Sequence, residues 1–261
     1  MILEDSTDVV TWERVKPGIM VVTMNRGPAN ALGVPLLDGL HAACDAAETA
    51  GDVKVMIIRS AIDGFFAAGA DIKHLGTIDA ESFTAYGNKM REVNDRLEAA
   101  PFLSIAAVDG LALGGGMELA MASTFRVATS AARFGLPEVN IGLIPGAGGT
   151  QRLPRLVGRG PALDIILTAR QVGTEEARAI GLVDRLATGD VVEAALALAD
   201  ELSNASLPAQ IAGIRSVDAA YDLPFEQGAQ VELEQEQGLF EHGEAAEGIK
   251  AFIEKRKPNF A

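Results

Sequence analysis

The stretch SIAAVDGLALGGGMELA, residues 104–120, leads from a strand-like apolar run into a helix-like apolar run through three consecutive glycines. Glu118 is the only charged side chain between Gly110 and Phe125. Glycines at a strand-to-helix junction let a ligand approach the backbone closely, and the free N–H groups of a first helical turn favour negative charge. The stretch therefore predicts either a ligand site or, more simply, a helix-capping glutamate beside glycines that serve packing.

Segments typical of strands and of helices alternate on both sides of this stretch. Residues 9–15 and 19–25 flank Pro17-Gly18 and predict a β-hairpin. Further strands are predicted at 53–60, 104–110 and 125–129, and helices at about 35–50 and 79–100. Strands that alternate with helices require crossover connections, so the sequence predicts an α/β fold with a largely parallel sheet.

The C-terminal part of the chain has a different pattern. From Leu207 to Phe260 it is typical of helices alone and is rich in Glu, Gln and Ala. We therefore expect an α/β core over residues 1–200 and a helical region over residues 201–261. Such a charged helical region either packs on its own core or forms an oligomer interface, and the pattern leaves both open.

Composition narrows the functional classes. The chain is 48% hydrophobic and 22% charged, as in ordinary soluble globular proteins. The single cysteine, Cys44, excludes a disulfide within the chain and any multi-cysteine zinc site. The N-terminus does not resemble a signal peptide, and no apolar run reaches the roughly 18 residues that span a bilayer. We expect a cytoplasmic protein that has no membrane partner.

The net charge of −14 argues against a nucleic-acid partner, because nucleic acids select basic surfaces. An anionic substrate would need local positive groups to offset this charge. Lys255-Arg256-Lys257 is one such group, although a solvated helix end explains it equally well.

Two more stretches combine glycines with few charges. In FGLPEVNIGLIPGAGGTQ, residues 134–151, Glu138 is the only charge, and the prolines and glycines predict an irregular loop with no helix clearly following Gly146–Gly149. Glu138 is then either an exposed loop residue or a partner of Glu118. Two isolated carboxylates in apolar surroundings suggest proton transfer, because desolvation raises a carboxyl pKa toward neutrality.

The third stretch, FFAAGADIK at residues 65–73, leaves backbone N–H groups accessible around Gly69 or simply forms a tight turn. The three histidines, His41, His74 and His242, have no metal-ligand spacing to one another, so no metal site is predicted.

Four separated motifs together resemble those of the enoyl-CoA hydratase (crotonase) superfamily. They are FAAGADIK at 66–73, GLALGGGMELA at 110–120, FGLPEVNIGLIPGAGGTQRLPR at 134–155 and AFIEKRKPNF at 251–260. The resemblance implies a crotonase-like (ClpP/crotonase) spiral of β-β-α units with a C-terminal helical trimerisation region. It also implies a homotrimer or a hexamer built as a dimer of trimers. The implied substrate is an acyl-CoA thioester, with no cofactor beyond the coenzyme A that the substrate carries.

The resemblance also implies roles for individual residues. The backbone N–H groups of Ala70 and Gly115 match the family's oxyanion hole, which holds the thioester oxygen as an enolate forms. Glu118 matches the residue that orients and helps deprotonate a water molecule. Glu138 matches the residue that delivers a proton to the α-carbon, and Gly146 matches a backbone contact to the same water.

By the same resemblance, coenzyme A would run past Ala68, Ala70, Asp71 and Ile72. Phe252 and Lys255 would reach it from a neighbouring subunit. The acyl pocket would be closed by helix 79–100, whose Phe83, Tyr86 and Met90 are candidates for its lining or for ordinary core packing.

One departure bears on the predicted reaction. The loop at residues 25–32, NRGPANAL, is shorter than the commonest family pattern and lacks a lysine that meets a CoA phosphate. Shorter loops of this kind resemble those of some isomerases and multifunctional relatives. Because both glutamates are present, we expect an enoyl-CoA hydratase, with a Δ3-Δ2 enoyl-CoA isomerase or another enolate-forming enzyme as the alternative. A CoA-binding protein that has lost the chemistry is the third possibility.

Overall fold

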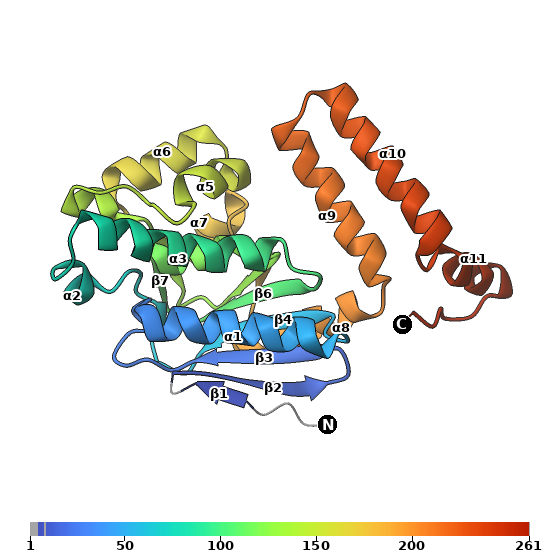
Figure 1. Ribbon diagram of the computed structural model, residues 1–261, viewed down its shortest axis with the longest axis horizontal. Coiled ribbons are helices and arrows are strands. Elements are labelled where there is room, and N and C mark those ends of the chain that lie inside the picture. The colour runs from blue at the N-terminus through green and yellow to red at the C-terminus, as the bar shows by residue number, and fades with distance from the viewer. Residues whose placement is uncertain (1–4, 8, 261) are drawn as a thin grey trace. The chain divides into compact units, whose positions relative to one another are not determined.

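Four of the predicted strands lie next to one another in the larger sheet of the computed structural model, which describes residues 5–7 and 9–260 (Figure 1). Each pairs in parallel with the next. They are β3 (Ile19–Met24), β4 (Val55–Ser60), β6 (Leu103–Val108) and β8 (Phe125–Ala128). β2 (Val10–Lys16) pairs antiparallel with β3 as the predicted hairpin. The largely parallel sheet is therefore confirmed, with β1 (Asp5–Thr7) and β11 (Arg185–Leu186) at its edges.

A second, smaller sheet was not predicted. Within the described residues it contains β5 (Phe65–Ala67), β7 (Leu111–Leu113), β9 (Arg133–Gly135) and β10 (Val172–Gly173), in the order β10-β9-β7-β5. Strands this short show no alternation of polar and apolar residues, so the sequence pattern misses them. The turn between β6 and β7 depends on Gly110, because a Cβ there would lie 2.2 Å from the carbonyl carbon of Gly64.

The two sheets are filled by successive β-β-α units. In each unit one strand enters the larger sheet, the next enters the smaller sheet, and a helix follows. After β4 and β5 come α2 (Ile72–Leu75) and α3 (Ala80–Glu98), and after β6 and β7 comes α4 (Gly115–Ala122). After β8 and β9 come the 3-10 helix η1 (Pro137–Ile141) and α5 (Gly149–Val157). This is the expected spiral of β-β-α units.

One local prediction was wrong. Residues 134–151 are not an irregular loop throughout, because they contain the end of β9, all of η1 and the start of α5. A helix does follow Gly146–Gly149, since Gly148 adopts a left-handed conformation (φ 106°) immediately before α5 begins at Gly149. The glycines and prolines therefore connect short elements rather than replace them.

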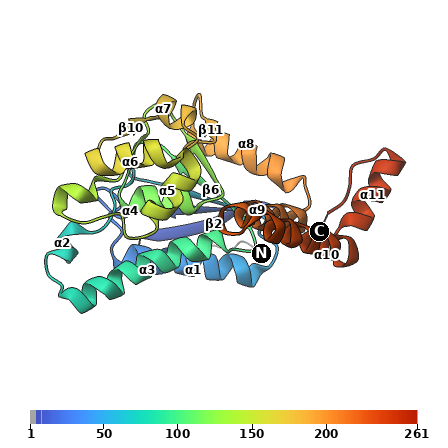
Figure 2. The same cartoon turned by 90° about the horizontal axis from the view of Figure 1, so that it is seen from above.

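Helix α1 (Val34–Ala50) and α3 lie side by side along the larger sheet (Figures 1 and 2). Both occupy the helical segments that the periodicity predicts. Apolar residues of α1, such as Leu36 and Leu40, are buried with those of β3 and β4 in one core. The first turn of α3 begins at Asp79, whose side chain accepts a hydrogen bond from the Ser82 N–H at 2.9 Å. The chain continues through α6 (Arg159–Thr168), α7 (Thr174–Ala179) and α8 (Val191–Ser203).

The chain divides into two compact units after Ala199. The second unit contains α9 (Leu207–Asp222), α10 (Phe225–His242) and α11 (Ala245–Glu254), as the C-terminal pattern predicts. Helices α9 and α10 run side by side as a hairpin (Figures 1 and 2). Among the described residues, no helix combines the length and apolar character needed to cross a bilayer.

Candidate active site

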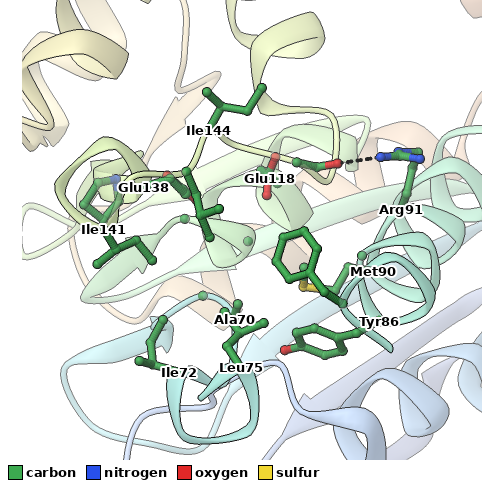
Figure 3. A pocket seen from close by; sticks show the side chains of 18 of the residues that line it. Ala70, Ile72, Leu75, Tyr86, Met90, Arg91, Glu118, Glu138, Ile141 and Ile144 are labelled. Carbon is green, nitrogen blue, oxygen red and sulfur yellow. Dashed lines mark hydrogen bonds between the residues drawn. The ribbon is translucent and has the colours of Figure 1, made fainter. Parts of the chain in front are cut away.

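The first unit contains a cavity of about 500 Å³ in which most of the predicted site residues meet (Figure 3). The β5–α2 turn, α3, the start of α4, η1 and the loop after η1 form its walls. Figure 3 shows Glu118 and Glu138 on one side of the cavity and Ala70, Ile72 and Leu75 on the other. The predicted residues that line it are Ala68, Ala70, Ile72, Gly115, Glu118, Glu138 and Gly146.

Two backbone N–H groups lie close together at the edge of this cavity. A Cβ added to Gly115 would lie 3.7 Å from the Ala70 nitrogen, and one added to Gly69 would lie 3.3 Å from the Gly115 nitrogen. Gly115 opens α4, so its N–H has no carbonyl partner within the helix. No other described residue accepts a hydrogen bond from either N–H group. Two free donors on one small volume are suited to hold an oxyanion.

The turn that carries Ala70 is held by its neighbours. The Leu32 N–H donates to the Gly69 carbonyl at 2.7 Å, and the Tyr86 hydroxyl donates to the Leu32 carbonyl at 2.5 Å. The same hydroxyl accepts from the Asp71 N–H at 2.9 Å. Tyr86 lines the cavity, as predicted for helix 79–100, and also fixes the position of this turn.

Asp71 does not line the cavity, unlike Ala70 and Ile72 on either side of it. Its carboxylate accepts from Arg26 Nη2 at 2.7 Å and from the His74 N–H at 3.2 Å. These bonds, with that to Arg26 the stronger cause, lower the pKa of Asp71. The arginine of the shortened loop at 25–32 thus binds Asp71 and stabilises the turn that carries Ala70.

Glu118 is nearly inaccessible to solvent, with 1% of its surface exposed. Its Oε1 accepts hydrogen bonds from the N–H groups of Ala147 at 2.8 Å and Gly149 at 2.7 Å. Desolvation raises the pKa of this carboxyl, while the two hydrogen bonds oppose the shift. A side chain at Gly149 would crowd this arrangement, because a Cβ there would lie 2.9 Å from Oε1. One carboxylate oxygen is therefore fixed, and Oε2 has no hydrogen-bond partner in the described part of the chain.

The loop that anchors Glu118 is itself held by side chains that the sequence analysis missed. Arg91 Nη2 donates to the Gly146 carbonyl at 2.9 Å, the contact drawn as a dashed line in Figure 3. Asn94 Nδ2 donates to the Ala147 carbonyl at 2.9 Å, and Arg152 Nη1 donates to the same oxygen at 3.2 Å. Asn94 is buried, so a polar residue within the apolar stripe of helix 79–100 was the signal that could have identified it.

Glu138 has fewer partners than Glu118. Burial raises its pKa to about 7, and the nearby charge of Glu118 adds to the shift. Its Oε2 is buried and has no hydrogen-bond partner among the described residues. Gly114 gives it space, because a Cβ at that position would lie 2.7 Å from Oε1. Glu138 can therefore bind and release a proton near neutral pH, next to the paired N–H groups.

The remaining walls of the cavity are mostly apolar. Phe83 and Met90 line it, which is one of the two alternatives that the sequence left open for them. Other large apolar residues that line it are Leu75, Ile141, Leu143 and Ile144. The predicted CoA contacts Phe252 and Lys255 belong to the second unit, where both are exposed. Their role remains a prediction.

The site thus combines donors for an oxyanion with two carboxylates in different protonation environments. Comparison with known proteins shows the family to which the chain belongs. The profile of the enoyl-CoA hydratase/isomerase family matches residues 14–261. A probable enoyl-CoA hydratase of Bacillus subtilis is 39% identical over 249 residues, which is 93% of this chain and 95% of that protein. The mitochondrial methylglutaconyl-CoA hydratase of Mus musculus is 37% identical over 98% of this chain and 84% of its own length.

The crystal structure of enoyl-CoA hydratase from Bacillus anthracis matches with a TM-score of 0.92 at 32% identity, covering 97% of this chain and 99% of that one. The chain belongs to the enoyl-CoA hydratase/isomerase family, within the crotonase superfamily.

Proposed function

We propose that this protein is an enoyl-CoA hydratase, which adds water across the double bond of a 2-enoyl-CoA thioester to give a 3-hydroxyacyl-CoA. The observation that carries the proposal is that Glu118 and Glu138 line one cavity together with the free N–H groups of Ala70 and Gly115. A hydration needs a base for water, a proton for carbon and a site for enolate charge. This arrangement offers all three.

The chemistry follows from these positions. The thioester oxygen accepts hydrogen bonds from Ala70 and Gly115, and the unpaired Oε2 of Glu118 takes a proton from water. The water oxygen bonds to the β-carbon, and the π electrons of the double bond move toward the thioester to form an enolate. Glu138 then gives its proton to the α-carbon. Proton exchange between the carboxyls and solvent restores the starting state.

The backbone N–H groups contribute most to stabilising the enolate. Loss of one such donor costs about 3–4 kcal/mol in other enzymes that use oxyanion holes. In the proposed mechanism these N–H groups activate the thioester, and no step uses a metal or a redox cofactor.

The CoA arm would pass Ala68, Ala70 and Ile72 on its way into the cavity. We place Asp71 behind this path, as a support for it. Phe252 and Lys255 would contact CoA from a neighbouring subunit in a homotrimer or hexamer, and Lys255 would offset part of the net charge of −14.

The direct test is hydration of crotonyl-CoA, followed by loss of the ultraviolet absorbance of the conjugated thioester. Glu118→Gln and Glu138→Gln should each reduce the rate by about 10²–10⁴-fold, the range for loss of a general acid or base. Glu92→Gln, an exposed change on α3, is the matched control and should keep wild-type activity.

A second assay separates hydration from isomerisation. Given 3-enoyl-CoA, a hydratase of this design should release little 2-enoyl-CoA, whereas an isomerase should convert it directly. Near wild-type hydration by both glutamine variants would disprove the assignment of the pair. Rapid conversion of the 3-enoyl substrate without hydration of crotonyl-CoA would favour the isomerase.

A further inference from the structure

A single peptide group connects Arg91 to Glu118. Arg91 Nη2 donates to the carbonyl oxygen of Gly146 at 2.9 Å, and the N–H of the next residue, Ala147, donates to Glu118 Oε1 at 2.8 Å. That carbonyl and that N–H belong to the same peptide group and point in opposite directions. A cation and a carboxylate therefore lie at the two ends of one peptide dipole (Figure 3).

This arrangement favours the ionised carboxylate. A cation that binds a carbonyl oxygen polarises the amide, so that its N–H becomes a stronger donor to an anion. Glu118 is buried, and desolvation is the largest influence on its pKa and raises it. The hydrogen bonds from Gly149 and Ala147 and the charges of Arg152 and Arg91 all act in the opposite direction.

The other arginines near Glu118 are paired with carboxylates. On α5, Arg152 Nη2 contacts Asp95 at 2.7 Å and Glu98 at 2.5 Å, so its charge is shared with two carboxylates. On β8, Arg126 pairs with Asp184 at 2.7 Å. The neighbouring strands β5 and β7 carry no charged residue.

Two charged groups near Glu118 have no oppositely charged partner among the described residues. On η1, Glu138 opposes ionisation of its neighbour. Arg91, in contrast, makes only polar contacts, to the Gly146 carbonyl and to Asn88 Oδ1, and no carboxylate among the described residues pairs with it. Its positive charge is therefore available to the Gly146–Ala147 peptide.

We propose that Arg91 is a positioning residue that acts through the Gly146–Ala147 peptide to keep Glu118 ionised and fixed in orientation. Glu118 then serves as the base and leaves Glu138 as the group that carries the proton. The division of labour between the two glutamates depends on this arginine. This inference rests on the proposed hydratase function for its kinetic consequence, but not for its effect on Glu118.

The first test measures Glu118 without using turnover. Protein labelled with ¹³C at the glutamate side-chain carboxyls is titrated by NMR, and the Glu118 signal is assigned from its absence in Glu118→Gln. In Arg91→Met, the Glu118 signal should titrate at higher pH than in the wild type, whereas Arg91→Lys should restore most of the difference.

The matched control is Lys89→Met. Lys89 lies on the same helix, but it pairs with Asp38 at 2.5 Å and does not line the cavity. This variant should titrate like the wild type. An unchanged Glu118 titration in Arg91→Met, or an equal shift in Lys89→Met, would overturn the proposal.

The second test is the pH dependence of hydration. Because Glu118 must be ionised to act as a base, loss of Arg91 should move the acidic limb of the kcat/KM profile to higher pH. We expect a loss of about fivefold on that limb for Arg91→Met, the size typical of a partly solvent-screened charge, with a smaller loss at alkaline pH. The effect should fall on kcat rather than KM, and Arg91→Lys should recover most of it.

An uncharged residue that holds the same loop shows what a purely structural role would do to the pH dependence of kcat. Asn94→Leu removes a donor to the Ala147 carbonyl without changing charge, so it should lower kcat equally at all pH values. If Arg91→Met also lowers the rate equally at all pH values, the arginine supports the loop and does not control ionisation. If the wild type hydrates no 2-enoyl-CoA across a range of chain lengths, the proposed function is wrong, while the NMR titration still decides the role of Arg91.

Discussion

At the scale of single residues, the two glutamates differ in their hydrogen-bond partners rather than in their type. Glu118 is the more deeply buried, yet two backbone N–H groups stabilise its charge. Glu138 is less buried and has an unpartnered Oε2 among the described residues, and its pKa rises to about 7. Two chemically identical side chains are thereby prepared for different tasks.

The raised pKa of Glu138 has a consequence for stability. An ordinary glutamate has a pKa of 4.5, so ionisation of Glu138 is less favourable in the folded protein, and the free energy of unfolding falls as pH rises toward about 7. Glu138→Gln removes the ionisation and keeps the shape. At pH 8 this variant should be more stable than the wild type by about 2 kcal/mol, allowing for partial exposure.

Thermal unfolding at two pH values measures this effect. The gain in Tm for Glu138→Gln should be clear at pH 8 and should nearly vanish at pH 4, where the wild-type carboxyl is mostly protonated in both states. An equal change in Tm at the two pH values would show that Glu138 does not titrate as described.

A second residue-scale prediction concerns Gly69, which has a φ of +89°. Its Cβ would lie 2.8 Å from the Leu113 carbonyl oxygen and 3.3 Å from the Gly115 nitrogen. Gly69→Ala should therefore obstruct the paired N–H groups and reduce kcat by about 10²–10³-fold, as for loss of an oxyanion-hole donor. Gly76→Ala is the control, because its Cβ would make ordinary contacts of 3.6 Å. Comparable activity of the two variants would argue against the role given to these N–H groups.

At the scale of elements, α3 supports both halves of the site. Tyr86 holds the turn that carries Ala70, whereas Arg91 and Asn94 hold the loop that anchors Glu118. In the proposed mechanism, one helix thus sets the distance between the N–H group that binds the thioester oxygen and the carboxylate that activates water. Small shifts of α3 should affect both functions together.

Tyr86→Phe tests this support. The change leaves the Leu32 carbonyl and the Asp71 N–H without their shared partner, at a cost of about 1–3 kcal/mol for unpaired buried groups. We expect a lower Tm and a kcat reduced by about tenfold, as the turn with Ala70 loses its position. Glu92→Gln, an exposed change on the same helix, should change neither quantity. A normal kcat in Tyr86→Phe would show that the turn is held without the hydroxyl.

At the scale of the whole molecule, the second unit exposes an unusual number of large apolar side chains. They are Val217, Tyr221, Leu223, Phe225, Leu233, Phe240, Ile249, Phe252 and Ile253. Exposed apolar groups of this extent indicate a protein–protein contact. They support the predicted assembly of this region into a homotrimer or hexamer.

Assembly can be tested by light scattering coupled to size-exclusion chromatography. The wild type should elute as a trimer or as twice a trimer, and Phe240→Glu, which places a charge at a side chain that is 72% exposed in the single chain, should dissociate it. Glu236→Gln on the same helix α10 is the control. A wild-type protein that remains monomeric at all concentrations would contradict the prediction.

Much of this organisation could be predicted from the sequence, for physical reasons that differ between elements. β3, β4 and β6 are buried apolar runs, and α1 and α3 have clear helical periodicity, so their patterns are strong. Glu118 and Glu138 were identifiable because isolated charges in apolar stretches are rare. The motifs at 66–73 and 110–120 then identified the family.

The parts that were missed depend on contacts between segments distant in sequence. The strands of the smaller sheet are two or three residues long, and only pairing between β5, β7 and β9 defines them. Arg91 and Asn94 contact a loop more than fifty residues away, which helical periodicity cannot show. Asp71 lies inside a recognised motif, but its bond to Arg26 directs it away from the cavity.

Four main-chain N–H groups shape the site: those of Ala70 and Gly115 would bind the substrate in the proposed reaction, and those of Ala147 and Gly149 hold Glu118. Point mutations replace side chains, but apart from changes to proline they leave the main-chain N–H in place. Mutational drift would therefore remove a glutamate far more easily than it would remove the main-chain N–H groups that bind a carbonyl oxygen. In a hydratase of the proposed kind, a gene copy released from selection would lose water addition first, and would keep a fold able to stabilise enolates for some other reaction.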